Sequence, residues 1–248
     1  MRFASLLLAA LALSATPASA APTPTKKPVA KPAAAKRAAR PARPAAWTSM
    51  VVRTAEGFRI GNPNATVKLI EYGSRTCPVC GAFGREATKP LMAYVASGKL
   101  SWEFREFLVH GQPDIAPALL GRCFGTTKFF PILERMYLDQ DAVEEKLGAP
   151  EARELGAKMQ AQPPLAVAQA WADYLDYIPF MTKLGIAPAQ SRACLTNAKD
   201  LDAILRVMGE AQDKLGVNGT PSFFINGKSA ERAYSWASLE PLLKAAGV

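Results

Sequence analysis

The sequence predicts an α/β fold that is interrupted by a long helical segment. Three observations predict it: residues 67–107 have the pattern of strand, helix and strand, residues 113–216 contain helical patterns without a convincing strand, and residues 217–248 have the pattern of a β-hairpin and a helix. The chain has 248 residues, of which 49% are hydrophobic. That is enough for one large domain, or two small ones, with an apolar core.

Residues 1–20 have the pattern of a secretory signal peptide. Arg2 gives a positive start, residues 6–13 are apolar, and Ala18-Ser19-Ala20 is a small-residue cleavage site. A buried N-terminal helix is the alternative, but the following segment offers it nothing to pack against. No apolar run in the sequence approaches the ~20 residues that cross a bilayer. We therefore expect an exported protein of the periplasm.

Residues 21–46 contain only Ala, Pro, Lys, Arg, Thr and Val, which predicts a disordered tether. The formal net charge of the chain is +9, and residues 1–46 hold eight basic residues and no acid, which leaves +1 for residues 47–248. A nucleic-acid-binding domain would carry its charge on a folded face, so we expect no nucleic-acid partner. The tether either attracts an anionic envelope surface or is a soluble spacer, and we prefer the spacer.

The first half of the fold follows from local patterns. Residues 48–53 are β-prone, and turn clusters surround 56–57 and 61–64. Residues 67–72 are nearly all apolar, as in a central strand. A helical pattern runs from Pro78 to Gly98, and residues 100–107 then alternate as a half-buried strand, which completes a right-handed βαβ unit.

The second half is helical until its last thirty or so residues. Gly216 is placed to cap the last helix of the inserted segment, and Asn226-Gly227 after the apolar run 222–225 predicts a tight hairpin. A final helix is expected over 238–246. Within the inserted segment, we assign helices to residues 116–124, 128–138, 165–177, 189–195 and 199–215.

Cys77-Pro78-Val79-Cys80 is a C-x-x-C motif that follows a strand directly and opens a helix. The unpaired N–H groups and the dipole of a helix N-terminus stabilise a thiolate, so Cys77 is the expected nucleophile. Cys80 lies one turn further in and is the expected resolving thiol. The motif indicates thiol–disulfide chemistry.

Two other uses of the motif were weighed. A structural zinc site needs a second ligand pair at tight spacing, but Cys123 and Cys194 are 71 residues apart and the sequence has one histidine, His110. An inert disulfide within C-x-x-C is sterically poor. We therefore expect no metal and no cofactor. We interpret His110 as a loop or strand-end residue and not as a catalyst.

Glu71 lies six residues before Cys77, and Gly-Thr-Pro-Ser-Phe-Phe-Ile-Asn-Gly occupies residues 219–227. With these features and the C-P-V-C motif, residues 48–248 resemble the DsbA-type thiol–disulfide oxidoreductases of the thioredoxin superfamily. The resemblance implies a thioredoxin fold with an inserted helical domain. Residues 47–112 and 217–248 would form the thioredoxin-like domain, and residues 113–216 the helical insertion.

The resemblance also implies the roles of several residues. Pro221 would be cis beside the cysteines, the backbone of Thr220 would pair with a substrate peptide, and Glu71 would be a buried acid that moves the proton of Cys80. Burial would raise the pKa of Glu71. The alternatives are an ordinary trans proline at Pro221 and a surface acid at a strand end for Glu71.

Pro78 and Val79 are expected to contact substrate. Val79 is a departure, because the best-known enzymes of this type carry Pro-His between their cysteines. Helix-terminus donors are then the main stabiliser expected for the thiolate, and the oxidising strength stays open. Phe83 could line either a peptide groove or the core.

Cys123 and Cys194 both lie in the inserted segment. We prefer a structural disulfide between them, because exposed free thiols are hazardous in an oxidising compartment, and some α-proteobacterial relatives have a similar second disulfide. Closing so long a loop would contribute about 4 kcal/mol in a chain-entropy treatment. The alternative is two separate buried thiols.

The function that we predict is an envelope oxidase that donates its Cys77–Cys80 disulfide to folding proteins. The resemblance implies reoxidation by a quinone-linked membrane partner of the DsbB kind, and we expect a monomer. A reductase or isomerase of the same fold is the alternative, although residues 21–46 cannot be the dimerisation domain that isomerases usually have. A non-catalytic peptide-binding or chaperone module is the third alternative.

Four apolar residues are expected to belong to the core of the insertion and not to a cofactor site: Phe129, Phe130, Met136 and Tyr137.

Overall fold

The computed structural model describes residues 46–248. The predicted signal peptide and all but the last residue of the predicted tether lie outside the described residues. Within the described part of the chain, no helix is both long enough and apolar enough to cross a membrane.

A mixed sheet of six strands forms the centre of the structure, in the order β1-β2-β4-β3-β5-β6. β3 and β4 run parallel, and the other neighbouring pairs are antiparallel. Helix α1 (Pro78–Ala96) connects β3 to β4, which confirms the predicted βαβ unit. The strands are β1 Val51–Arg53, β2 Phe58–Gly61, β3 Val67–Gly73, β4 Leu100–Glu106, β5 Ser222–Ile225 and β6 Lys228–Ser229.

Helices cover both faces of the sheet. Side chains alternate between the two faces along each strand, so neighbouring residues of one strand pack against different helices. Val67 and Leu69 belong to one apolar cluster with residues of α1 and of α10 (Trp236–Ala246). Tyr72 belongs to another cluster with residues of α9 (Ala198–Leu215). The alternation places Glu71 on the face that α1 covers, where water has no access.

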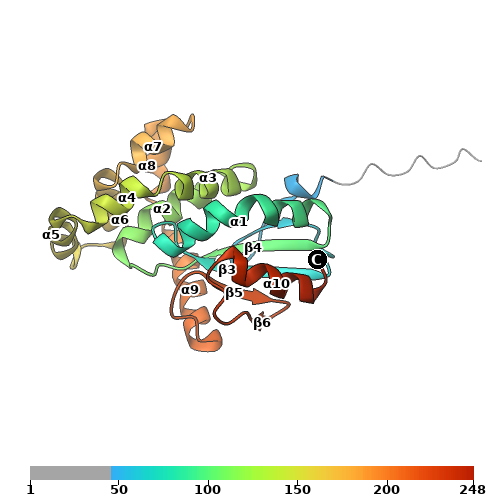
Figure 1. Cartoon of the computed structure of the whole chain (residues 1–248). Coiled ribbons are helices and arrows are strands. Elements are labelled where there is room, and N and C mark those ends of the chain that lie inside the picture. The colour runs from blue at the N-terminus through green and yellow to red at the C-terminus, as the bar shows by residue number, and fades with distance from the viewer. Residues whose placement is uncertain (1–45) are drawn as a thin grey trace, which may run out of the picture. The chain divides into compact units, whose positions relative to one another are not determined.

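The inserted segment is helical throughout, and Figure 1 shows helices α4 to α8 gathered at one end of the sheet. Its largest apolar cluster is its own, built around residues such as Leu119, Trp171 and Met181. The remaining helices are η1 Trp47–Ser49, α2 Gln112–Cys123, α3 Thr126–Leu138, α4 Asp141–Gly148, α5 Pro150–Met159, α6 Pro164–Tyr174, α7 Tyr177–Lys183 and α8 Pro188–Cys194.

Local signals predicted several ends correctly. Gly216 is left-handed and caps α9, and Asn226 and Gly227 both have positive φ in the β5–β6 hairpin, as a type I′ turn requires. The helix expected over 165–177 is instead divided, because α6 ends at Tyr174 and Asp176 is left-handed before α7 begins. β2 was missed because only three residues, 58–60, separate the two predicted turn clusters, and α4 and α5 were not assigned.

One prediction about the core was wrong. Phe129, Phe130 and Tyr137 belong to the apolar cluster of the sheet, and only Met136 of the four belongs to the cluster of the insertion. The ring of Phe129 stacks on Phe58 of β2 at a centroid distance of 3.9 Å. Helix α3 lies against α1, so its apolar face completes the core beside the sheet.

Candidate functional site

Cys77 and Cys80 lie at the N-terminus of α1, and both are free thiols in this structure. Cys77 is the residue before the helix and has extended backbone angles, and Pro78 is the first helical residue, where its missing N–H does no harm. Cys80 is completely buried and Cys77 is 5% exposed, whereas Pro78 and Val79 are exposed beside them. A partner can therefore reach the motif from the side of Cys77.

The two thiols differ in acidity. The pKa of Cys77 is lowered to about 6, first by a hydrogen bond from the Cys80 thiol, against the effect of burial, and then by Thr220 and the N–H groups of Cys80 and Val79. The pKa of Cys80 is raised well above its usual value, first by burial and then by Cys77. At neutral pH this arrangement supports a thiolate at Cys77 and a thiol at Cys80.

The Thr220–Pro221 segment lies next to Cys77, although 143 residues separate Cys77 from Thr220. The peptide bond between Thr220 and Pro221 is cis. In its protonated form, the Cys77 thiol donates to the carbonyl oxygen of Thr220 at 3.3 Å. Antiparallel pairing of β5 with β3, with Ser222 opposite Tyr72, brings the segment to this end of the sheet.

Glu71 is completely buried in the middle of β3, which excludes the surface alternative. Its Oε2 accepts a hydrogen bond from Trp102 Nε1 at 3.0 Å, while its Oε1 has no partner in the structure. Burial is the largest cause that raises the pKa of Glu71 to about 8, and the Trp102 hydrogen bond opposes it. Glu71 also raises the pKa of Cys80, so the two groups interact. Glu71 is thus a neutral acid with a free oxygen at neutral pH.

The loop before Cys77 is held by residues that sequence reasoning missed. Arg75 is buried, and its guanidinium pairs with Glu106 at the end of β4, with an Nη2–Oε1 distance of 2.8 Å. The Arg75 guanidinium also lies over the ring of Phe129 at 5.0 Å. No local pattern pointed to this pair, since one partner lies in a loop and the other closes an alternating strand.

Gln140 is a second residue that sequence reasoning missed. Its side chain is buried, and Nε2 donates to the carbonyl oxygens of Cys77 at 3.0 Å and Arg75 at 3.1 Å. A Cβ atom at Gly81 would lie 1.7 Å from Gln140 Oε1, so the residue after the motif has no room for a side chain. The isolated glycine inside a helical pattern was the available signal for this close contact.

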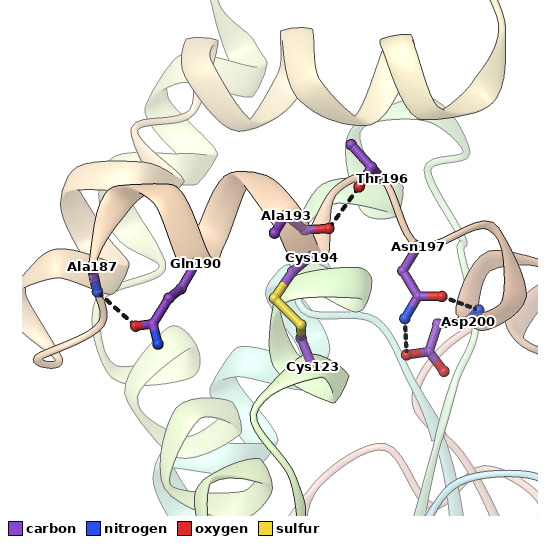
Figure 2. Close-up of a disulfide and its surroundings, with 8 residues drawn as sticks. All are labelled: Cys123, Ala187, Gln190, Ala193, Cys194, Thr196, Asn197 and Asp200. Atoms are coloured by element: carbon purple, nitrogen blue, oxygen red, sulfur yellow. Dashed lines mark hydrogen bonds between the residues drawn. A yellow bond between two sulfur atoms is a disulfide. The ribbon is translucent and has the colours of Figure 1, made fainter.

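Figure 2 shows the bond between Cys123 and Cys194, which joins the last residues of α2 and α8. Their Cα atoms are 5.8 Å apart. Cys194 is 4% exposed and Cys123 is half-buried. The neighbouring Asn197 side chain accepts from the backbone N–H of Asp200 and begins α9 directly after the bond.

We expect the two disulfides of the oxidised protein to differ in resistance to reduction. Mild dithiothreitol treatment should open Cys77–Cys80 and leave Cys123–Cys194 intact, because an acidic Cys77 thiol stabilises the reduced form of the reactive pair, whereas a structural bridge has a low reduction potential. Peptide mapping under non-reducing conditions measures both. Free Cys123 and Cys194 thiols in protein purified from an oxidising compartment would contradict the expectation.

The reduced protein should react first at Cys77. Iodoacetamide near pH 7 should label Cys77 about 10²-fold faster than Cys80, because the rate follows the thiolate fraction and Cys80 is buried. Mass spectrometry of a labelling time course measures the ratio, and the denatured protein, in which both thiols react alike, is the control. Faster labelling of Cys80 would overturn the assignment.

The described part of the chain contains no cluster of three or more His, Cys, Asp or Glu placed to hold an ion.

Residues 53–245 match a family model described as thioredoxin. The chain belongs to this thioredoxin family.

Similar proteins agree with the fold of this thioredoxin-family chain. A Rickettsia conorii protein assigned as a protein-disulfide oxidoreductase is 27% identical over 68% of this chain and 52% of its own. The chain thus spans about half the length of the curated relatives that it matches. The crystal structure of a protein-disulfide isomerase from Novosphingobium aromaticivorans has a TM-score of 0.72 and 27% identity, and covers 79% of this chain and 100% of its own. The crystal structure of Wolbachia pipientis alpha-DsbA1 has a TM-score of 0.57 and 20% identity, and the match covers 75% of this chain and 88% of the Wolbachia chain.

Proposed function

We propose that this chain is a thiol–disulfide oxidoreductase that introduces disulfides into folding proteins of the cell envelope through a Cys77–Cys80 disulfide. The observation that carries the proposal is the opposite shift in acidity of two adjacent thiols, with the pKa of Cys77 at about 6 and that of Cys80 raised. An acidic thiol leaves a mixed disulfide readily, which favours the transfer of oxidation to a substrate.

The reaction transfers two electrons in two steps. A substrate thiolate attacks Cys77 Sγ, a substrate–Cys77 disulfide forms, and Cys80 leaves and takes up a proton. A second substrate thiolate then attacks the substrate sulfur of the mixed disulfide and releases Cys77 as a thiolate. The substrate gains a disulfide, and the chain has taken up two electrons and the proton on Cys80.

In the first step Glu71 would supply the proton that Cys80 needs, and it would then regain a proton from solvent, which is the proton that the chain takes up overall. Cys80 is a poor leaving group as a thiolate, because burial raises its pKa. A neutral carboxylic acid with a pKa of about 8 and a free oxygen can donate that proton at neutral pH. Pro78 and Val79 are exposed beside Cys77, and we propose that they contact the substrate, with the Thr220 backbone and Pro221 as the other side of the site.

The cellular setting is part of the same proposal. Residues 1–20 would direct export to the periplasm, and Cys123–Cys194 would be a structural disulfide that suits an oxidising compartment. Folding proteins would be the substrates, and a quinone-linked membrane partner of the DsbB kind would restore the Cys77–Cys80 disulfide. We propose that the chain acts as a monomer.

Isomerisation or reduction by the same site is the second candidate, favoured by the name of the Novosphingobium structure. The reduction potential separates the candidates. A Cys77 pKa between those of thioredoxin and DsbA predicts a potential between their values of about −270 and −120 mV. Equilibration with glutathione buffers measures it. A value at or below about −270 mV would overturn the oxidase in favour of a reductase.

Catalysis itself is tested with the Cys77→Ser variant. The oxidised wild-type protein should form disulfides in a reduced, unfolded substrate, and in the presence of a reductant it should accelerate insulin reduction. Cys77→Ser should do neither, because no mixed disulfide can form. Equal activities of the two proteins would exclude enzyme function and leave a peptide-binding module.

A further inference from the structure

His110 is the only histidine in the sequence, and it lies in the turn between β4 and α2. Its Nδ1 is 2.8 Å from Oγ1 of Thr76, the residue directly before Cys77. Its side chain is 41% exposed, so the ring is accessible to solvent. The proposed oxidase mechanism makes no use of this contact.

The hydrogen bonds around Thr76 determine which atom of His110 carries a proton. Asp114 is buried, its Oδ1 pairs with the Thr76 hydroxyl, and its Oδ2 accepts from the His110 backbone N–H at 2.8 Å. An ionised carboxylate can only accept, so the Thr76 hydroxyl proton points to Asp114. The Thr76 oxygen must then accept from His110 Nδ1, which is therefore protonated.

The motif beside Cys77 offers no charge of its own, because its two central residues are proline and valine. We propose that His110 is the cationic partner of the Cys77 thiolate, and that it takes up a proton when the Cys77–Cys80 disulfide is reduced. Reduction creates one negative charge at Cys77. The imidazolium next to Thr76 would compensate it, with Asp114 holding the ring in place. The inference rests on the proposed role of Cys77.

The charges around His110 agree with this assignment. The pKa of His110 is raised, first by the Asp114 carboxylate, whose Oδ1 lies 3.7 Å from Nδ1, against the effect of burial, and then by the negative charge of Cys77. Linkage is reciprocal: a thiolate that raises the pKa of His110 has its own pKa lowered by the imidazolium to the same extent.

Two other charged residues line the same cavity as His110, which has a volume of about 770 Å³ and which Thr76 and Pro78 also line. They are Glu144 from α4 and Arg153 from α5, and they have opposite charges. Neither changes its covalent state when the disulfide is reduced. A redox-dependent change at His110 therefore reports the charge at Cys77.

The test uses the single histidine as its own probe. In protein without a histidine tag, the imidazole C–H proton resonances of His110 are followed by NMR from pH 5 to 9 in the oxidised and reduced forms. We expect the midpoint to be higher in the reduced form by about half a unit or more, as for a unit charge several ångströms away in half-buried surroundings. In a Cys77→Ser variant, addition of reductant should leave the midpoint unchanged.

Absorbance of the thiolate gives the reciprocal measurement. His110→Gln should raise the pKa of Cys77 by a similar amount, and His110→Lys, which keeps a positive charge, should restore most of the lowering. A purely structural role of His110 would not produce this difference between Gln and Lys.

Equal His110 midpoints in the two redox states would overturn the inference, as would an unchanged Cys77 pKa in His110→Gln. If these variants fail to fold, the wild-type NMR comparison still decides. A low Cys77 pKa together with a redox-insensitive His110 would reject this inference alone. A Cys77 that shows no low pKa would reject both the inference and the nucleophile of the proposed function.

Discussion

Glu106→Gln is expected to lower the free energy of unfolding by about 3–5 kcal/mol, as when one partner of a buried ion pair is removed. Glu106 is 2% exposed, and both its oxygens accept from the Arg75 guanidinium, at 2.8 to 3.2 Å. Arg122 is also buried, which lowers its pKa to about 10, and Glu106 opposes that shift. Glu106 is thus the counter-charge of Arg75 and also acts on Arg122, whose Nε lies 3.8 Å from Asp200 Oδ1, and glutamine would leave Arg75 without its counter-charge.

Urea unfolding of the oxidised protein at neutral pH measures the loss. Glu210→Gln is the matched control, because Glu210 pairs with Arg206 on the exposed surface of α9, where solvent screens the pair. We expect little change there. An Arg75→Met/Glu106→Leu double variant should be more stable than Glu106→Gln, since an apolar pair leaves no charge uncompensated at that position. Equal losses in Glu106→Gln and Glu210→Gln would contradict the expectation.

Glu71→Gln is expected to remove a large pH dependence of stability. The pKa of Glu71 is raised from 4.5 to about 8 by burial, so the folded state holds a proton that the unfolded state loses. Wild-type stability should therefore be fully present below pH 4.5 and should fall as the pH rises toward 8. The loss between pH 5 and pH 8 should be about 3 kcal/mol. Glutamine has no such proton, so the variant should gain that amount relative to wild type.

The measurement is a series of unfolding curves from pH 5 to 8 on oxidised protein, in which neither active-site thiol titrates. Glu86→Gln, on the exposed side of α1, controls for the substitution itself. We also expect Glu71→Gln to oxidise substrates more slowly, because Cys80 would lose its proton donor. Parallel pH profiles for Glu71→Gln and wild type would show that Glu71 is ionised in the fold.

Much of the fold could be predicted from local patterns. The alternation over residues 100–107 indicated β4, the helical pattern after Pro78 indicated α1, and Asn226-Gly227 indicated the last hairpin. These elements could be predicted because their patterns depend on backbone preferences within a few residues. β2 and the break at Asp176 were not predicted, since a four-residue strand and one left-handed aspartate have no comparable signal.

The candidate site also has a part that local sequence patterns predict and a part that they do not. A C-x-x-C motif at a helix N-terminus locates the two thiols, because the motif and the helix start are adjacent in the sequence. The apolar run over residues 67–72 indicated a central strand, but neither the face on which Glu71 lies nor what covers it. The same limit explains the misassigned Phe129 and Phe130, whose helical pattern shows an apolar face without naming its partner.

The sequence by itself determined the nucleophilic motif, the βαβ unit that carries it and the helical character of the insertion, since each depends on neighbours along the chain. Only the tertiary structure decided the rest. It buried Glu71, brought the Thr220 carbonyl to Cys77, paired Arg75 with Glu106, and placed His110 beside Thr76. The acidity of a thiol or a carboxyl group depends on desolvation and on charges within several ångströms. Those distances are set by which elements pack together, and no local pattern encodes them.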